Sequence, residues 1–227
     1  MLAIRPPEYF PGLEYAALLL QAGAVVLADT FQYSRQSFQN RARLRTPDGW
    51  QWISVPLERG QHGAAIAGTR LREGTGWQRT HWKALVFNYG AAPFFDAYAP
   101  RLRPLFEQPW TLLGALTCAT VAAVHALLEA PSRLVRASAL DGAPADLPKV
   151  LAAAGGGPLL VPEAVAAVDA GHAAEAYALR CVPPVYRQAF AGFEPGMSAL
   201  DLLFNYGPEA RRILDERTVV AACERDR

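Results

Sequence analysis

The chain has 227 residues, of which 52% are hydrophobic and 19% are charged, and its formal net charge is +1. This composition excludes a disordered chain, because it supplies enough apolar side chains for a core. It also argues against nucleic acid as a partner, since proteins that bind a duplex usually carry a large basic excess. Of the 22 basic residues, 20 are arginine. Guanidinium groups bind phosphates and carboxylates better than ammonium groups do, so the positions of the arginines are informative.

The N-terminal part has the pattern that opens a parallel α/β sheet. A short apolar run at 2–4 predicts a strand, and three prolines in the loop 5–12 exclude both a helix interior and a central strand. Residues 13–22 predict a helix that ends at a glycine. Residues 24–29 then predict a buried strand that ends in Asp29. The succession of strand, loop, helix and strand is typical of a βαβ fold.

The next segment is strongly polar and predicts an inserted β-hairpin. Arginines alternate with apolar residues over 41–45, as expected of a strand with one charged face. The sequence Thr-Pro-Asp-Gly at 46–49 fits a type I turn. Residues 50–57 predict the returning strand.

The middle of the chain is predicted to be helical. Residues 77–90 form one helix in this prediction, and prolines interrupt 92–106. The apolar run at 110–130 is about long enough to span a bilayer. Small and polar residues recur along it at a spacing of three, which favours a helix packed inside the protein. We therefore expect no membrane span.

Strands and helices alternate in the C-terminal part. Strands are predicted at 132–138, 157–162 and 176–183, and helices at 147–154, 163–170, 198–207 and 208–216. The predicted fold is a single α/β domain over 1–227. It has an open, mostly parallel, Rossmann-like sheet, an inserted β-hairpin and a helical middle segment.

The common motifs of nucleotide-binding loops, serine hydrolases and metal sites are absent from the sequence. Cys118, Cys181 and Cys223 are widely spaced and odd in number, which supports neither a disulfide framework nor a zinc site. The start of the chain lacks the pattern of a signal peptide. We therefore expect a cytoplasmic protein with no metal and no cofactor.

Four motifs occur in a fixed order along the chain. They are Pro-x-Tyr-x-Pro at 7–11, Gln-Tyr followed by Asn-Arg-x-Arg at 32–43, Trp-x-x-x-His ending in Asn-Tyr at 77–89, and Ser-x-x-Asp ending in Asn-x-Gly at 198–207. Together they resemble the WbqC-like family of bacterial proteins, and the resemblance spans nearly the whole chain. Many members of that family are associated with gene clusters for O-antigen and other surface polysaccharides.

The resemblance implies a transferase that acts on an activated sugar or a related anionic metabolite. Acyl or aminoacyl transfer to an amino sugar is one such reaction. One branch of the family has His-Gln where this chain has Arg5 and Pro6. A chemical step that needs that histidine is therefore absent here. This departure favours the alternative function, a non-catalytic module that binds a ligand or a partner protein.

His81 is the catalytic candidate, because the pKa of a histidine can lie near the working pH. The alternative is a core histidine beside Trp77 and Leu85 on one helix face. The arginines from Arg35 to Arg45 form either an anion pocket or a solvated strand face. Candidate substrate-binding residues lie at strand ends or in the family motifs: Tyr9, Asp29, Gln32, Tyr33, Arg35, Asn40, Arg41, Arg43 and Tyr89.

Overall fold

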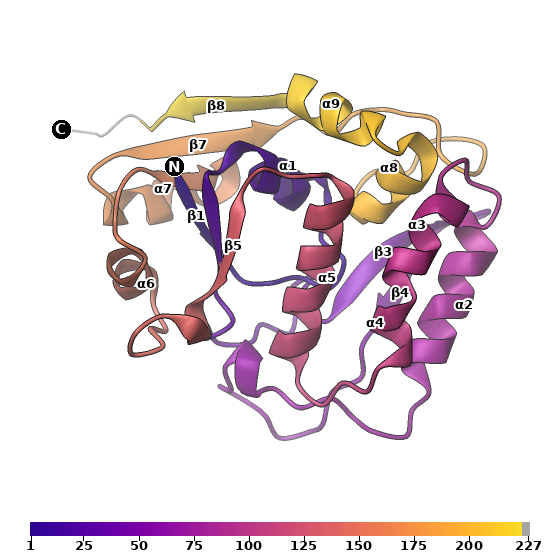
Figure 1. Cartoon of the computed structure of the whole chain (residues 1–227), viewed down its shortest axis with the longest axis horizontal. Helices are drawn as coiled ribbons and strands as arrows, with labels where there is room; N and C mark the ends of the chain where they lie inside the picture. The colour runs from indigo at the N-terminus through magenta and orange to yellow at the C-terminus, as the bar shows by residue number, and fades with distance from the viewer. Residues whose placement is uncertain (224–227) are drawn as a thin grey trace.

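The computed structural model describes residues 1–223, and its centre is an open six-stranded sheet with the order β5-β2-β1-β6-β7-β8 (Figure 1). All neighbouring strands are parallel except the last pair, β7 and β8. The five parallel strands have the order of a Rossmann fold, with the first and fourth of them, β1 and β6, adjacent at the centre. The strands are β1 (Leu2–Arg5), β2 (Ala24–Leu27), β5 (Arg133–Arg136), β6 (Leu159–Pro162), β7 (Ala176–Cys181) and β8 (Thr218–Ala222).

Helices cover both faces of this sheet. The residues of each strand alternate between two hydrophobic clusters, because successive side chains of a strand point to opposite faces. Ala3 of β1 belongs to the cluster under α1, α5, α8 and α9, whereas Leu2 and Ile4 belong to the cluster under α6. These helices are α1 (Leu13–Gln21), α5 (Leu113–Leu127), α6 (Leu147–Ala153), α8 (Ala199–Tyr206) and α9 (Glu209–Glu216).

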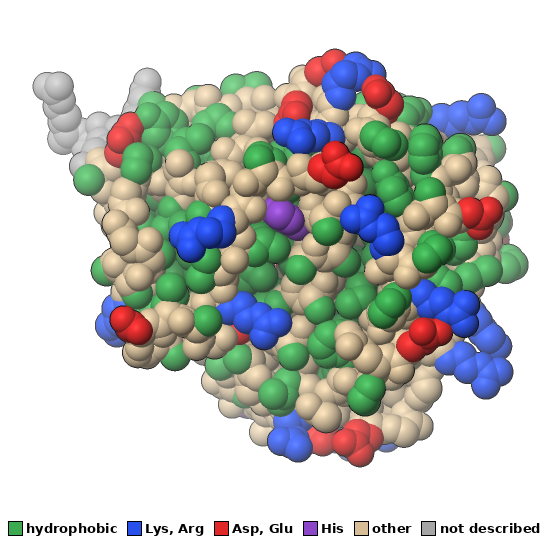
Figure 2. Space-filling model, in the orientation of Figure 1, with side chains coloured by type: hydrophobic (Ala, Val, Ile, Leu, Met, Phe, Trp, Pro, Cys, Tyr) green, Lys and Arg blue, Asp and Glu red, His purple; other side chains and the backbone are tan. Residues whose placement is uncertain are grey.

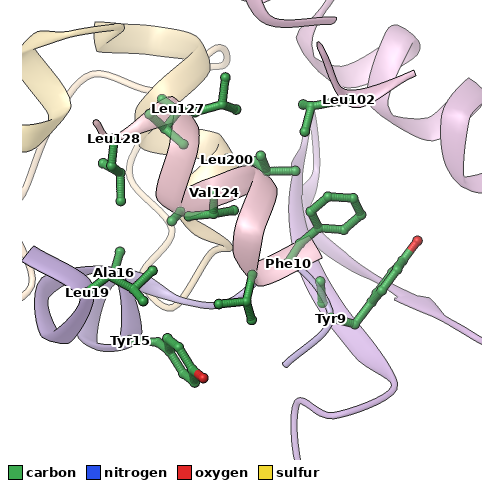
Figure 3. Packing of buried hydrophobic residues seen from close by; sticks show 14 of the residues in the cluster. Tyr9, Phe10, Tyr15, Ala16, Leu19, Leu102, Val124, Leu127, Leu128 and Leu200 are labelled. Atoms are coloured by element: carbon green, nitrogen blue, oxygen red, sulfur yellow. The ribbon is translucent and has the colours of Figure 1, made fainter. Parts of the chain in front are cut away.

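The proline-rich loop between β1 and α1 inserts two aromatic rings into the larger cluster. Tyr9 and Phe10 are almost fully buried, and Figure 3 shows Phe10 beside Leu200 of α8. Phe10 has a positive φ of 47°, an uncommon conformation for a bulky residue, and its N–H donates to the Thr120 hydroxyl of α5 at 3.3 Å. The aromatic side chains of the loop are therefore part of the core.

The inserted hairpin forms a separate two-stranded sheet of β3 (Arg41–Thr46) and β4 (Gly49–Ser54). Ala42, Leu44 and Ile53 on one face are buried in the core, and β3 contacts α2. The opposite face carries the arginines. The helical middle segment follows at the right of Figure 1, as α2 (Trp77–Tyr89), α3 (Phe95–Leu102) and α4 (Pro104–Glu107).

The predicted fold class is confirmed, but several element boundaries differ. The segment 92–106 is mostly helical despite its prolines: Pro93 precedes α3, Pro100 lies inside α3 and Pro104 is at the first turn of α4. Residues 163–170 form short helical turns around α7 (Ala166–Asp169) rather than one helix. The antiparallel edge strand β8 has no counterpart in the prediction. Within residues 1–223, no helix is both long and apolar enough to cross a bilayer.

Candidate functional site

A cavity of about 890 Å³ opens beside the hairpin, a size typical of small-molecule sites. Five of the nine residues predicted to bind substrate lie around it. The loop after β2 contributes Gln32, Tyr33 and Arg35, and the start of the hairpin contributes Asn40 and Arg41. These five side chains come from one polar segment of the sequence, so the sequence motif at 32–43 folds into one wall of the cavity.

Hydrogen bonds within this wall fix the orientation of its polar groups. The Tyr33 hydroxyl donates to Oδ1 of Asn40 at 3.1 Å, and Nδ2 of Asn40 donates to the carbonyl of Val55 at 3.0 Å. Nε of Arg41 donates to the carbonyl of Ser37 at 3.1 Å. Burial raises the pKa of Tyr33, so its hydroxyl stays protonated and remains a donor at neutral pH. The wall is therefore preorganised before any ligand binds.

The cavity carries an excess of positive charge. Arg35, Arg41 and Arg59 line it, and none of the three forms an ion pair with Asp or Glu in the part of the chain that the structure describes. The carboxylate of Glu58, also on the lining, lies 3.7 Å from Nε of Arg70. Three guanidinium groups without acidic partners are suited to a ligand that carries negative charge.

A second wall of the cavity was missed by the sequence analysis. It comprises the end of β4 and the segment that follows it, including Ser54, Arg59, Gln61, His62 and Gly63. The signal that could have found it is a short run of polar residues between two glycines that both have a φ of 78°. Such a run is typical of a turn, and the hairpin register brings this segment beside the motif at 32–43, because Ser54 pairs with Arg41.

His81 does not line the cavity, because it is buried behind the hairpin. Its Nδ1 is 2.9 Å from the hydroxyl of Tyr9, and its ring contacts Trp77 with ring centroids 5.2 Å apart. Burial lowers the pKa of His81 to about 4, against the smaller opposing effect of a hydrogen bond to the backbone of Ser54. The imidazole is therefore neutral at pH 7. Ser54 is also a cavity residue, so His81 and Tyr9 form a second layer behind the wall.

The remaining candidates lie apart from the cavity. Asp29 is buried at the end of β2, where it accepts hydrogen bonds from the N–H and the hydroxyl of Ser138 at 2.9 and 2.6 Å. Tyr89 is buried at the end of α2, and its hydroxyl accepts from the N–H of Arg45 at 2.9 Å. Arg43 lies two residues after Arg41 on the outer face of the hairpin, where its guanidinium is 4.0 Å from the ring centroid of Trp50.

Arg45, the last arginine of β3, is hydrogen-bonded to other parts of the protein. Its guanidinium donates to Oε1 of Gln188 at 3.1 Å and to the carbonyls of Thr46, Gly49 and Ala191. Asp201 of the fourth motif belongs to the same buried network: its Oδ2 accepts from the Tyr186 hydroxyl at 2.6 Å and from Gln188 at 3.0 Å. Asp201 of the fourth motif is therefore linked through Gln188 to the turn end of the hairpin.

No group of three or more His, Cys, Asp or Glu side chains in residues 1–223 is arranged to hold a metal ion. Figure 2 shows that basic and acidic side chains are interspersed over the visible face, as expected from the small net charge. The cavity lining is thus a local concentration of arginine on an otherwise mixed surface.

Comparisons with known proteins agree with the motif resemblance. The model of the WbqC-like protein family matches residues 6–213. The uncharacterized protein Rv1507c of Mycobacterium tuberculosis is 33% identical over 220 residues, which cover 92% of this chain and 94% of that protein. No solved structure matches the chain significantly.

Proposed function

The chain belongs to the WbqC-like protein family, and from this premise we propose that it is a transferase of surface-polysaccharide biosynthesis. It binds an activated sugar or a related anionic metabolite in the cavity beside the hairpin. The transferred group is an acyl or aminoacyl group, and the acceptor is an amino sugar. The compartment is the cytoplasm, which is consistent with three cysteines that are all free.

The observation that carries this proposal is a set of three cavity arginines that form no ion pair with Asp or Glu among residues 1–223. An arginine paired with a carboxylate already has its preferred ligand, whereas Arg35, Arg41 and Arg59 have no such carboxylate in this part of the chain and can bind an anion. A sugar hydroxyl would be recognised by Gln32, an exposed amide on the same lining, because the amides of Asn40 and Gln61 already bond to protein groups and Thr69 is buried. The arginines would bind the charged activating group, and the Gln32 amide would bind the sugar of the same ligand.

Acyl transfer to an amine requires a base, because the amine loses a proton as the new bond to the acyl carbon forms and the leaving group departs. Two of the four histidines of the chain lie at or directly behind the cavity. His62 lies on the cavity lining, while His81 lies behind Ser54 and is hydrogen-bonded to Tyr9. His62 can reach a ligand directly, and His81 can reach one only if the wall moves.

The second candidate function is a non-catalytic module that binds the same ligand. The buried, neutral state of His81 favours it, because the histidine implied by the motifs is then a core residue. The two functions share the cavity and differ only in turnover.

Isothermal titration of the full chain with glucose 1-phosphate tests the shared part of the proposal. The double variant Arg35→Ala/Arg41→Ala should weaken binding by at least about tenfold, because each charge-assisted hydrogen bond contributes roughly 1.5–3 kcal/mol. Arg180→Ala is the matched control, since Arg180 is an exposed arginine on β7 outside the cavity. Equal affinities in all three proteins, or no binding to the wild type, would contradict the proposal.

Turnover separates the two functions. A transferase should convert an acyl thioester and a UDP-linked amino sugar into the N-acylated product. His62→Ala should abolish this conversion while the dissociation constant for glucose 1-phosphate stays unchanged. Binding without turnover in the wild type would assign the chain to the binding module.

A further inference from the structure

The outer face of the hairpin carries alternating arginine and aromatic side chains, which we name the Arg–Trp stripe: Phe38, Arg41, Arg43, Trp50 and Trp52. The guanidinium of Arg41 is 4.3 Å from the ring centroid of Trp52, and that of Arg43 is 4.0 Å from Trp50 and 4.9 Å from Trp52. Trp52 also contacts Phe38 and Trp50, each with ring centroids 5.6 Å apart. The five side chains are therefore one contiguous surface.

This surface continues the cavity. Arg41 belongs to both, because it lines the cavity and lies over Trp52. The strand register gives the order along the hairpin: Arg41 faces Ser54 at the cavity, Arg43 faces Trp52 next, and Arg45 faces Trp50 at the far end. The four residue steps from Arg41 to Arg45 correspond to roughly 13 Å of strand.

Two aromatic side chains of the stripe are exposed, the other three side chains are partly buried, and Arg43 has an unused hydrogen-bond donor. Trp50 is 40% exposed and Phe38 is 41% exposed, although large aromatic side chains usually bury most of their area. Arg43 forms no ion pair in the described residues 1–223, and its Nε is buried without a hydrogen-bond acceptor. An aromatic ring and a stacked, unpaired guanidinium are the groups that bind a planar ring next to an anion.

Taken with the proposed function, on which this inference rests, the geometry points to a nucleoside diphosphate sugar as the ligand class. We propose that the base stacks on Trp50 and that the diphosphate lies against the guanidinium groups of Arg43 and Arg41. The sugar then enters the cavity. Along the hairpin, Trp50 comes first, the two arginines come next and the cavity comes last. This order matches the order of base, diphosphate and sugar in such a ligand.

The same observations disfavour a nucleic-acid strand. Binding of single strands uses several successive stacking platforms along an extended basic groove. Here the stripe ends at the hairpin turn, where the next charged residue is Asp48, and the whole chain has a net charge of only +1. A neutral glycan would stack on Trp50 but would leave the arginines without a ligand.

Calorimetry on the full chain tests this inference with UDP, GDP, CDP, dTDP, UDP-glucose and glucose 1-phosphate as probes. At least one nucleoside diphosphate should bind, and Trp50→Ala should weaken that binding by about tenfold or more. Trp50→Phe should recover most of the loss, because it restores an aromatic face. Phe87→Ala, which removes an exposed aromatic ring of α2 outside the stripe, should change nothing. Glucose 1-phosphate should bind equally well to wild type and to Trp50→Ala.

Three results would overturn the inference, and they are distinguishable. In the first result, glucose 1-phosphate binds through Arg41, UDP-glucose binds no more tightly than glucose 1-phosphate, and Trp50→Ala leaves the affinity for UDP-glucose unchanged. The proposed function then stands and the base subsite is wrong. If no probe binds, both proposals fail. If a short oligothymidylate binds more tightly than every diphosphate and depends on Trp50, the stripe is a nucleic-acid surface.

Discussion

The two ends of strand β3 carry arginines on the same face, yet their surroundings are opposite. At the turn end, Arg45 is 2% exposed and its guanidinium is bonded to Gln188 and three carbonyls. At the cavity end, Arg41 is partly exposed and forms no ion pair within residues 1–223. The difference shows that one sequence pattern can supply both a buried arginine that holds an element in place and a partly exposed arginine at a cavity.

The first prediction concerns stability at the turn end. Arg45→Met should lower the free energy of unfolding by about 3–5 kcal/mol, because it removes a donor from partly buried carbonyls, removes one of the two donors to Oε1 of Gln188 and removes the positive charge near Asp201. Urea denaturation measures this loss. Arg35→Met is the control, and it should stay within about 0.5 kcal/mol of wild type because Arg35 is exposed. Similar losses of unfolding free energy in both variants would contradict the difference described between the two ends of β3.

The second prediction concerns two buried groups on either side of Tyr9. Burial raises the pKa of Glu8 from 4.5 to about 7. The folded chain therefore holds this proton more tightly than the unfolded chain does, and Glu8 makes the fold less stable as pH rises from 4.5 to 7. Burial lowers the pKa of His81 from 6.5 to about 4, so this group makes the fold more stable as pH rises through 4 to 6.5. The two effects, each roughly 3 kcal/mol, nearly cancel in the wild type.

Single variants should expose the two opposing effects. Glu8→Gln should give a protein whose unfolding free energy rises between pH 4 and 6.5, and His81→Gln should give one whose unfolding free energy falls between pH 4.5 and 7. Chemical denaturation at a series of pH values measures both slopes. If His81→Gln leaves the pH profile unchanged, His81 is not the buried neutral group described above.

The sequence predicted much of this architecture for physical reasons that can be named. The βαβ opening followed from apolar runs separated by a proline loop, and the shared face of Arg41, Arg43 and Arg45 followed from the alternation of strand side chains. What could not be predicted depends on contacts distant in sequence. Burial of Arg45 requires the carbonyl of Ala191, 146 residues away, and the second cavity wall requires the register of β4.

The same reasoning explains the placement of His81. Its position on one helix face with Trp77 and Leu85 is typical of a core residue, and the structure buries all three. The sequence left a catalytic and a structural interpretation open, because spacing alone does not show what lies against a helix face. The hydroxyl of Tyr9, 72 residues earlier, occupies that position.

The third and smallest prediction concerns the cavity end. Arg41→Lys keeps the positive charge but loses the planar contact with Trp52 and the hydrogen bond from Nε to Ser37. We expect the dissociation constant for UDP-glucose to rise by about three- to tenfold, with unfolding free energy within about 0.5 kcal/mol of wild type. Calorimetry and urea denaturation on the same preparation measure the two quantities. A large loss of stability would mean that Arg41 fastens the hairpin as Arg45 does.

The most direct test of the cavity as the ligand site is a crystal structure of the chain with UDP-glucose. We expect the sugar in the cavity and a phosphate oxygen within hydrogen-bond distance of Arg41, with the base against Trp50. In a Rossmann fold the alternative site is the crevice at the carboxyl ends of β1 and β6, beside Arg5. A ligand bound in that crevice, with the cavity empty, would contradict the account.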